Sequence, residues 1–290
     1  MGNRDDTNTN EMYESRIDEI QRTFKKRKFS LYKPESEFPE LIVTVPDSWP
    51  YVKLAPWYDV HYGHVLHAKE LFDRHRQWFI REPYVLGWNG GDFIENVVEG
   101  SPGIYTQKEY PGEQFDNAVE LLAPMRHKLL FALPGNHEAR TMRVAGFDIA
   151  KHLAKDLKIP YFPDYCFCTI KWRGMKFRLC AHHGTGAAQT PGGQRNAARK
   201  DMPWVGADLY VTGHLHQPIA DVVYRADYDQ RSDRMVSRSS VVIISPSYLR
   251  YFGGYGAAKR LGPGSLGLTV AELQSNGNIE VSVHAKGKRL

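Results

Sequence analysis

The chain has 290 residues, of which 42% are hydrophobic and 24% charged, and its 38 Lys and Arg against 33 Asp and Glu give a formal net charge of +5. This balance is typical of a globular protein and excludes a disordered, collagen-like or disulfide-stapled chain. Cys166, Cys168 and Cys180 are not spaced as a thiolate zinc site, and residues 1–12 carry no apolar segment typical of a signal peptide. No apolar run approaches the roughly 20 residues that span a bilayer, so we expect no membrane association and a cytoplasmic location.

The positive charge lies near the two ends of the chain. Eight basic side chains account for it, namely Arg22, Lys25, Lys26, Arg27, Lys28, Lys286, Lys288 and Arg289. Without these eight charges the net charge of +5 becomes −3. A basic arm and tail can contact a polyanion, but solvated termini are the favoured interpretation, and a wholly basic nucleic-acid-binding body is not indicated.

We assign residues 1–50 to an N-terminal extension and residues 51–290 to the main domain. The extension begins with a polar segment predicted to be disordered. A helix is predicted over residues 11–28, because apolar side chains recur there at helical spacing. Four prolines between Pro34 and Pro50 then indicate an extended connector.

From residue 51 the pattern alternates between apolar runs and amphipathic segments. An apolar run ends at Tyr58, and a helix is predicted over 65–81. A second apolar run at 84–86 is followed by a predicted helix over 113–123 and a third run at 128–133. This β-α-β-α-β order predicts an α/β domain.

The second half of the chain is richer in predicted strands. Segments 166–172 and 175–181 flank a turn and predict a hairpin, and so do 266–273 and 279–284. Further strands are predicted near 208–212, 219–225 and 241–245. The polar segment between His216 and Val241 is interpreted as a hairpin or a mobile loop.

Metal-ligating residue types follow the apolar runs, where each run opens into Gly or a polar loop. The five segments are Asp59-Val60-His61, Gly91-Asp92, Gly135-Asn136-His137-Glu138, His182-His183-Gly184 and Gly213-His214-Leu215-His216. Taken singly, each is more typical of a surface loop, a turn or a cap. Taken together at strand ends, they predict that carboxylate, imidazole and amide groups meet at one edge of a sheet.

This series of motifs, from Asp59 to His216, resembles the calcineurin-like metallophosphoesterase superfamily. The resemblance implies an α/β fold in which a two-sheet sandwich is flanked by helices and carries a two-metal site at the strand ends. It further implies a metal-dependent phosphoesterase, a hydrolase that acts on ester bonds. Two features depart from the family pattern, namely Pro56-Trp57 before Asp59 and the segment Ser245–Tyr248 in place of a Gly-Ser turn.

The resemblance also assigns roles to individual residues. Asp59, His61 and His216 would hold the first ion, Asn136, His183 and His214 the second, and Asp92 would bridge them as a catalytic ligand, with His137 as the proton-transferring residue. His183 is preferred to His182 because it directly precedes Gly184, and His182 would then support the site. A carboxylate, imidazole and amide donor set suits Mn²⁺ best, with Fe or Zn²⁺ as alternatives. Two such ions would share a hydroxide that attacks phosphorus in line.

Arginines after the motifs are candidates for binding substrate phosphate. Arg140 follows the GNHE motif, and Arg195 follows a Gly-rich segment, although both also suit solvated helix faces. Aromatic side chains flank the motifs at Trp57, Tyr58, Tyr62 and Trp88; core packing is favoured over stacking on a base.

The leading functional hypothesis is a phosphodiesterase or nuclease that acts on nucleotides or nucleic acid. The alternatives are a phosphomonoesterase or protein phosphatase, and a non-enzymatic binding scaffold on the same fold. Loss of ligands would favour the scaffold, and no ligand of the family pattern is missing. The sequence leaves the native substrate and the oligomeric state open.

Overall fold

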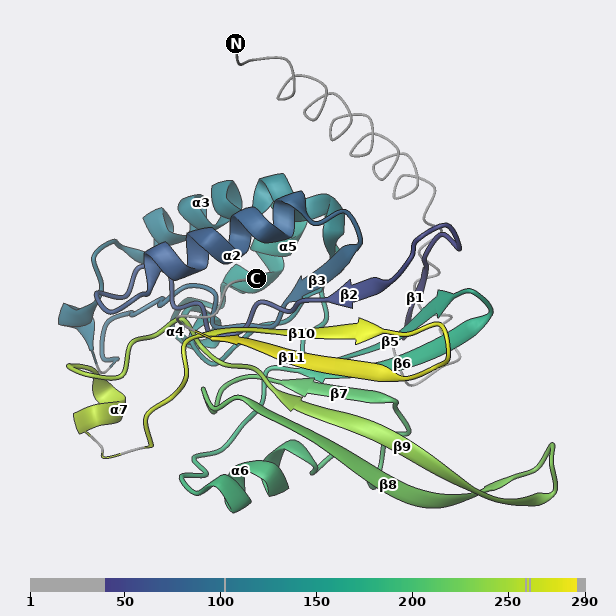
Figure 1. Ribbon diagram of the computed structural model, residues 1–290. Coiled ribbons are helices and arrows are strands. Elements are labelled where there is room, and N and C mark those ends of the chain that lie inside the picture. Colours follow the sequence, from purple (N-terminus) through teal and green to yellow (C-terminus); the bar gives the residue numbers. More distant parts are fainter. Residues whose placement is uncertain (1–39, 102, 259, 261, 286–290) are drawn as a thin grey trace, which may run out of the picture.

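The computed structural model describes residues 40–101, 103–258, 260 and 262–285. Its strands form two sheets that lie face to face, with helices on the outer sides (Figure 1). The two-sheet α/β sandwich expected from the sequence is therefore confirmed.

The six-stranded sheet has the order β1, β5, β6, β7, β9, β8, with bounds Glu40–Thr44, Tyr165–Trp172, Met175–His182, Leu209–Thr212, Arg234–Ile244 and Ile219–Asp229. The five-stranded sheet has the order β11, β10, β2, β3, β4, with bounds Ile279–Ala285, Gly267–Leu273, Val52–Leu54, Val85–Asn89 and Leu129–Ala132. The described α-helices are α2 (Lys69–Arg81), α3 (Pro111–Leu122), α4 (Glu138–Ala145), α5 (Ile149–Leu157), α6 (Pro191–Ala198) and α7 (Tyr255–Ala258). Two short 3-10 helices cover Ile104–Thr106 and Ala123–Lys128.

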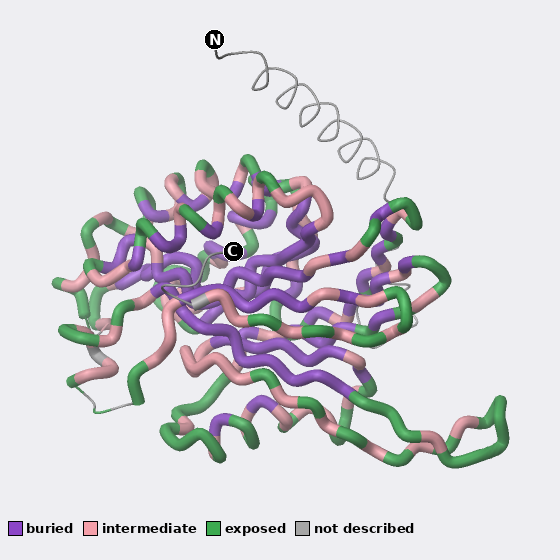
Figure 2. The backbone as a smooth tube through the Cα atoms, in the orientation of Figure 1, coloured by how far each residue is buried: buried purple, intermediate pink, exposed green. Residues whose placement is uncertain are grey.

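Three apolar clusters hold these layers together. The first lies between the two sheets and joins Trp88 of β3 to Ile170 of β5 and Ile243 of β9. The second packs α2, α3 and α5 onto the outer face of the five-stranded sheet, and the third packs α6 onto the outer face of the six-stranded sheet. Figure 2 shows the resulting pattern, with buried strands at the centre and exposed chain outside. None of the helices within the described residues combines the length and the apolar character that crossing a membrane requires.

The sandwich begins earlier in the chain than the sequence indicated. Residues 40–44 form β1, which pairs in parallel with β5, and the side chains of Leu41, Val43 and Val45 are buried between the sheets. Residues 40–45, which were assigned to the extension, therefore belong to the sandwich. Residues 40–45 can form a strand because no proline interrupts them, so every residue of β1 keeps its backbone N–H. The prolines at positions 39 and 46 lie outside this segment of the sequence. The disordered start and the helix predicted over 11–28 lie outside the described residues.

Most predicted elements of the main domain are present. Both predicted hairpins form, as β5–β6 and β10–β11, and the polar segment after His216 forms a long hairpin, β8–β9. The first predicted helix begins four residues later than expected, at Lys69. The sequence missed α4, α5 and α6, which have eight or nine residues each.

Parallel pairing brings the motif loops together. β2, β3 and β4 are parallel to one another, and so are β6, β7 and β9. β2 ends at Leu54 because Pro56 cannot donate, yet Ala55 and Trp57 still donate their backbone N–H to Leu86 and Trp88. The chain therefore remains extended beside β3 until Asp59, and the strand ends of both sheets open at the same edge of the sandwich.

Candidate metal centre

The five motif segments meet at this edge. Their ligand atoms form three overlapping groups, and within each group the atoms lie within 4.8 Å of one another. The groups are Asp59, His61 and His216; His61, Asp92 and His137; and Asp92, His183 and His214. His61 and Asp92 each belong to two groups, so the three form one continuous cluster.

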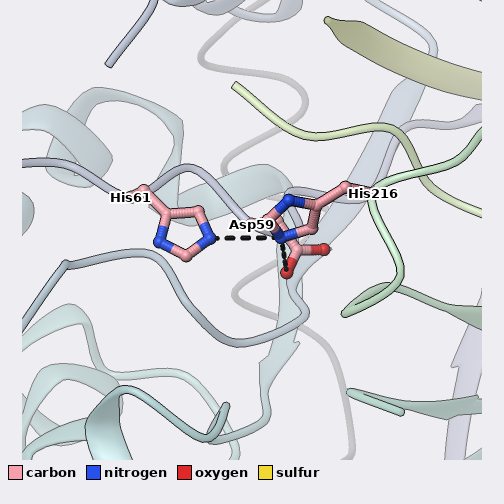
Figure 3. Close-up of side chains that lie close together, drawn as sticks. All are labelled: Asp59, His61 and His216. Atoms are coloured by element: carbon pink, nitrogen blue, oxygen red, sulfur yellow. Dashed lines mark hydrogen bonds and ion pairs between the residues drawn. The ribbon is translucent and has the colours of Figure 1, made fainter. Parts of the chain in front are cut away.

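The first half of the cluster consists of Asp59, His61 and His216, whose side chains point toward one another (Figure 3). The Nε2 atom of His216 lies 3.1 Å from Oδ1 of Asp59 and 3.3 Å from Nε2 of His61. On the other side of the His61 ring, Nδ1 lies 2.9 Å from a carboxylate oxygen of Glu95. Because a carboxylate only accepts, neutral His61 keeps its proton on Nδ1 and directs the Nε2 lone pair into the cluster.

The second half consists of Asn136, His183 and His214. Nδ1 of His183 donates to the backbone oxygen of Gly90 at 2.9 Å, and Nε2 of His214 donates to that of Gly186 at 2.9 Å. The remaining nitrogen of each neutral ring is therefore an acceptor, and both face Oδ1 of Asn136, at 3.2 and 2.8 Å.

Asp92 joins the two halves. Its side chain is fully buried, and Oδ2 lies 3.3 Å from Nε2 of His183 and 3.8 Å from Nε2 of His137. Its other oxygen, Oδ1, accepts the backbone N–H of His137 at 2.8 Å. The carboxylate therefore offers one oxygen to the backbone and one to the centre of the cluster.

This donor set fits divalent cations. With both rings neutral, the imidazole nitrogens of His183 and His214 and the oxygens of Asn136 and Asp92 are acceptors that face acceptors, an arrangement that is repulsive unless a proton or a cation lies between them. The raised pKa of His183 reflects the same demand for positive charge at this position. The outward nitrogens of His61, His183 and His214 are each held by an oxygen, which is how proteins orient metal-binding histidines.

The pKa values of the site residues show that the aspartates and the imidazoles interact strongly. Burial alone would raise the pKa of both aspartates, but neighbouring imidazoles hold the pKa of Asp59 and of Asp92 below its usual value. In return, Asp92 overcomes the effect of burial on His183 and raises the pKa of that imidazole to about 10. Burial, reinforced by His216, lowers the pKa of His61 to about 4, so that ring is neutral at pH 7.

The backbone is strained where it delivers these ligands. Asp59, His61, Asp92, His214 and His216 all have positive φ, between 49° and 66°. Non-glycine residues rarely adopt this region, and such strain is concentrated at functional sites. Close backbone approach also requires Gly135, where an added Cβ would lie 2.1 Å from Oδ1 of Asp92.

Two acidic residues support the cluster and were not identified from the sequence as site residues. The buried carboxylate of Glu138 accepts the backbone N–H groups of Asp92, Phe93, Ile94 and Gly135 at 2.8–3.2 Å, and thereby ties two motif loops together. Burial and the charge of Asp92 raise the pKa of Glu138 to about 7, and the N–H donors act in the opposite direction. Glu138 is part of the GNHE motif, whereas nothing in the sequence marks Glu95, which lies three residues after Asp92.

His137 and Arg140 form a pair beside the cluster. Nδ1 of His137 donates to the backbone oxygen of Glu95 at 2.7 Å, and Nε2 faces NH2 of Arg140 at 2.9 Å. Arg140 is held in turn by the backbone oxygen of Glu95 at 2.8 Å. Burial, with smaller effects of His61 and Arg140, lowers the pKa of His137 to about 4. The imidazole is therefore neutral at pH 7 and accepts from the guanidinium.

Two residues expected at or near the site lie elsewhere. His182 points away from the cluster and lies 2.9 Å from Asp201, so it does not support the site. Arg195 is half exposed, and its described contact is an ion pair with Asp221 of β8, at 3.2 Å. Adjacent residues of a strand face opposite sides, which is why His183 enters the cluster and His182 does not.

The aromatic residues near the motifs are mostly core residues. Trp57, Tyr58 and Trp88 are buried, whereas Tyr62 is partly buried. The late segment Ser245–Tyr248 also has a structural role, because Tyr248 donates its backbone N–H to the backbone oxygen of Asp59 at 3.0 Å and its ring stacks on Trp57.

No family model matches the chain, and no curated protein matches it. Solved structures with a similar arrangement include a metallophosphoesterase from Sphaerobacter thermophilus, with 16% identity, a TM-score of 0.42 and coverage of 82% of this chain and 89% of that one. A predicted phosphoesterase from Streptococcus pneumoniae has 12% identity and a TM-score of 0.33, over 82% of this chain and 100% of that one. A mutant of Vps29 from Entamoeba histolytica has 12% identity and a TM-score of 0.36, over 81% and 99%.

These likenesses are too distant to indicate an activity. The fold and the site are therefore evident from this structure alone: helices flank two sheets, and the motif residues meet at the strand ends. The chain thus has the sandwich fold and the placement of motif residues that its resemblance to the calcineurin-like metallophosphoesterases implies.

Proposed function

We propose that the protein is a dinuclear-metal-dependent phosphoesterase. The observation that supports this most strongly is the convergence of ligand side chains from five separate motif segments, with Asp59, His61, Asp92 and His183 buried and with cluster nitrogens and oxygens facing one another at 2.8–3.3 Å. Such a cluster is costly to bury without cations.

In this proposal the two halves hold one ion each. Asp59, His61 and His216 bind the first ion, and Asn136, His183 and His214 bind the second; Asp92 contributes to both. Ions bound there would act as Lewis acids that polarise a phosphoryl oxygen and lower the pKa of water. The mixed nitrogen and oxygen donor set favours Mn²⁺, with Fe or Zn²⁺ as alternatives.

The chain's own groups would orient the substrate and handle the proton. Arg140 is held by Glu95 with NH2 at the edge of the cluster, where its guanidinium can bind a phosphoryl oxygen. When Arg140 turns to the substrate, Nε2 of His137 is freed to hydrogen-bond or protonate the leaving oxygen. The Nδ1–H bond to Glu95 keeps the ring in place for this role.

Within this class we favour a phosphodiesterase or nuclease that acts on nucleotides or nucleic acid. Two exposed aromatic side chains support it, Tyr105 at 95% and Phe252 at 83% exposure. Tyr105 lies in the short 3-10 helix Ile104–Thr106 and Phe252 lies in a turn. Both segments are hydrogen-bonded to the segment after His61, from Val65 N–H to the Thr106 backbone oxygen and from Arg250 N–H to that of Leu66. Exposed aromatic rings beside a phosphate site can stack on bases.

A substrate panel with added Mn²⁺ tests the proposal. The panel sets bis-p-nitrophenyl phosphate, single-stranded DNA, RNA and cyclic nucleotides against p-nitrophenyl phosphate and a phosphopeptide. We expect diesters to be hydrolysed faster than monoesters. The reverse order would favour the phosphomonoesterase or protein phosphatase alternative, and absence of both activity and metal binding would favour a binding scaffold.

A further inference from the structure

Among the described elements, the β8–β9 hairpin extends far beyond the body of the sandwich (Figure 1). Each of its strands has 11 residues, and they pair without a register shift from Ile219–Ile244 to Asp229–Arg234. Arg225 lies six residues into β8, about 20 Å along the strand from its start. The distal hairpin therefore lies away from the metal cluster.

One face of this hairpin is uncovered. Val241 and Ile243 of β9 are buried between the two sheets. The same face of the hairpin continues beyond the sandwich, where it carries Tyr224 of β8 and Met235 of β9. There the apolar side chains are exposed, with Tyr224 at 73% and Met235 at 62% exposure. Figure 2 shows the change from buried chain in the body to exposed chain in the hairpin.

β8 is also a free sheet edge. It is the last strand of the six-stranded sheet, and no strand of the described chain pairs with its outer side. Edges of this kind are normally protected by a short length, a bulge, Pro or charged side chains, especially Lys. β8 carries charged side chains of both signs, at Asp221, Arg225, Asp227 and Asp229, but none of the other features. Residues 219–244 contain no Lys, Pro or Gly, and the ladder has no bulge.

The charge of the hairpin indicates which partner fits. Residues 219–244 carry four Asp and four Arg, so the segment is neutral overall. A neutral ribbon is a poor match for nucleic acid or an anionic membrane, which select a basic surface. Alternating opposite charges favour a partner with the same alternation.

We propose that β8 pairs antiparallel with β8 of a second copy of this chain, with the two-fold axis at Ala226. In this register Arg225 lies opposite Asp227 of the second copy, and Tyr224 lies opposite Tyr228 of the second copy; symmetry repeats both pairs. Asp227 also forms an exposed ion pair with Arg238 of its own β9, at 2.8 Å, and in the dimer its carboxylate would lie between the two arginines. The side chains of opposite residues share a face, so only registers centred on a residue are possible.

Neighbouring registers are worse. Centring the axis on Arg225 or on Asp227 places that residue opposite its own like charge. Centring it on Tyr224 places Asp221 opposite Asp227 of the second copy, and centring it on Tyr228 places Asp227 opposite Asp229 of the second copy. Like charges directly opposite each other destabilise a strand pair. Centring the axis on Val223 would place Asp221 opposite Arg225 of the second copy, but Asp221 is already held by Arg195 and Arg199 of its own chain, which leaves Ala226 as the centre.

Charge-swap variants of the full chain test this pairing by sedimentation equilibrium over a range of concentrations. We expect the parent to dimerise. Arg225→Asp and Asp227→Arg should each weaken the dimer about tenfold or more, because each turns two attractive pairs into repulsive ones. An equimolar mixture of the two variants should restore a dimer, as should the double variant Arg225→Asp/Asp227→Arg. A monomeric parent, or variants that dimerise like the parent, would overturn the proposal.

A symmetric disulfide tests the register itself. In the proposed dimer the two Ala226 residues face each other at a Cα separation of about 4.5–5.5 Å, which a disulfide can span. Ala226→Cys should therefore cross-link under mild oxidation, and Ala220→Cys, exposed on the same face, should not. Circular dichroism of each variant checks that it is folded. Equal cross-linking of both, or of neither in a dimeric sample, would contradict the register.

Discussion

The metal cluster and the β8–β9 hairpin both hold charged side chains, but with opposite consequences: the cluster lies on loops that follow strands of both sheets, and the hairpin lies at the edge of the six-stranded sheet. In the cluster the carboxylates of Asp59 and Asp92 are buried, acceptors outnumber donors, and five ligand residues have positive φ. In the hairpin the charges are balanced, exposed and set in a regular ladder. An excess of buried acceptors requires a cation, whereas a balanced, exposed alternation suits another protein surface.

Asp92→Asn should have the largest effect on the cluster. It removes the charge that lies between the two halves while the side chain keeps its size. We expect weaker Mn²⁺ binding and a loss of hydrolysis on the order of 10³-fold. Isothermal titration and steady-state kinetics measure the two effects, and Asp221→Asn on β8 is the matched control. Parent-like metal binding in Asp92→Asn would remove the basis for a shared ligand.

His137→Ala should keep the ions and lose rate. The His137 ring lies beside the cluster and is held by Glu95 and Arg140 rather than by the two ligand sets. We expect kcat to fall about 10²–10⁴-fold with unchanged Mn²⁺ stoichiometry. His182→Ala, one residue from a proposed ligand but bound to Asp201, is the control and should retain nearly full activity. Loss of metal in His137→Ala would instead make His137 a ligand.

Glu95→Gln tests whether the carboxylate that holds the proposed ligand His61 contributes to metal binding without being a ligand itself. Glu95 fixes the tautomer of His61, and its backbone oxygen still binds His137 and Arg140 in the variant. We expect metal affinity or activity to fall about 10–100-fold. Glu109→Gln, on a partly buried carboxylate away from the cluster, should leave both unchanged. Equal effects of the two substitutions would contradict a specific role for Glu95.

Arg140→Ala and Arg195→Ala compare the two arginines expected to bind substrate. Arg140 lies against His137 at the cluster, whereas Arg195 pairs with Asp221 on β8. We expect Arg140→Ala to lower kcat/KM about tenfold or more and Arg195→Ala to have little effect. Steady-state kinetics on the preferred diester decides, and a larger effect of Arg195→Ala would reverse our placement of the substrate.

The smallest predicted effect concerns stability and pH at His75. Burial lowers the pKa of His75 from 6.5 to about 4, so the unfolded chain binds more protons than the folded chain between these values. The free energy of unfolding should therefore fall as pH drops from about 6.5 towards 4, by about 1–3 kcal/mol for this residue. Urea unfolding at neutral pH and near pH 5 should show a weaker pH dependence in His75→Gln; equal dependence in both proteins would contradict it.

The sequence was most informative where chemistry and strand ends coincide. The motifs from Asp59 to His216 carry the resemblance that implied the two-sheet sandwich, and the structure has this fold. The structure also brings the proposed metal ligands together in one cluster. The residues that support the ligands were harder to identify. Glu95 acts through a three-dimensional contact that no spacing rule reveals, and His182 and Arg195 required knowledge of which way each side chain faces.

The missed elements have a similar explanation. β1 lies between two of the prolines that suggested a connector. Its strand conformation depends on pairing with β5, whose residues lie 127 positions later in the sequence, since Leu41 pairs with Cys168 and Glu40 with Phe167. Helices α4 and α6 have eight residues each and bury few side chains, Glu138 in α4 and Gln194 and Ala198 in α6, so no long apolar stripe marks them in the sequence.

The most direct test of the central claim is the number of Mn²⁺ ions bound per folded chain at neutral pH, measured by isothermal titration with elemental analysis of the dialysed protein. We expect two ions to bind to each parent chain, and we expect hydrolysis of bis-p-nitrophenyl phosphate to require both bound ions. A parent chain that is folded, binds no divalent ion and hydrolyses no phosphate ester would contradict it.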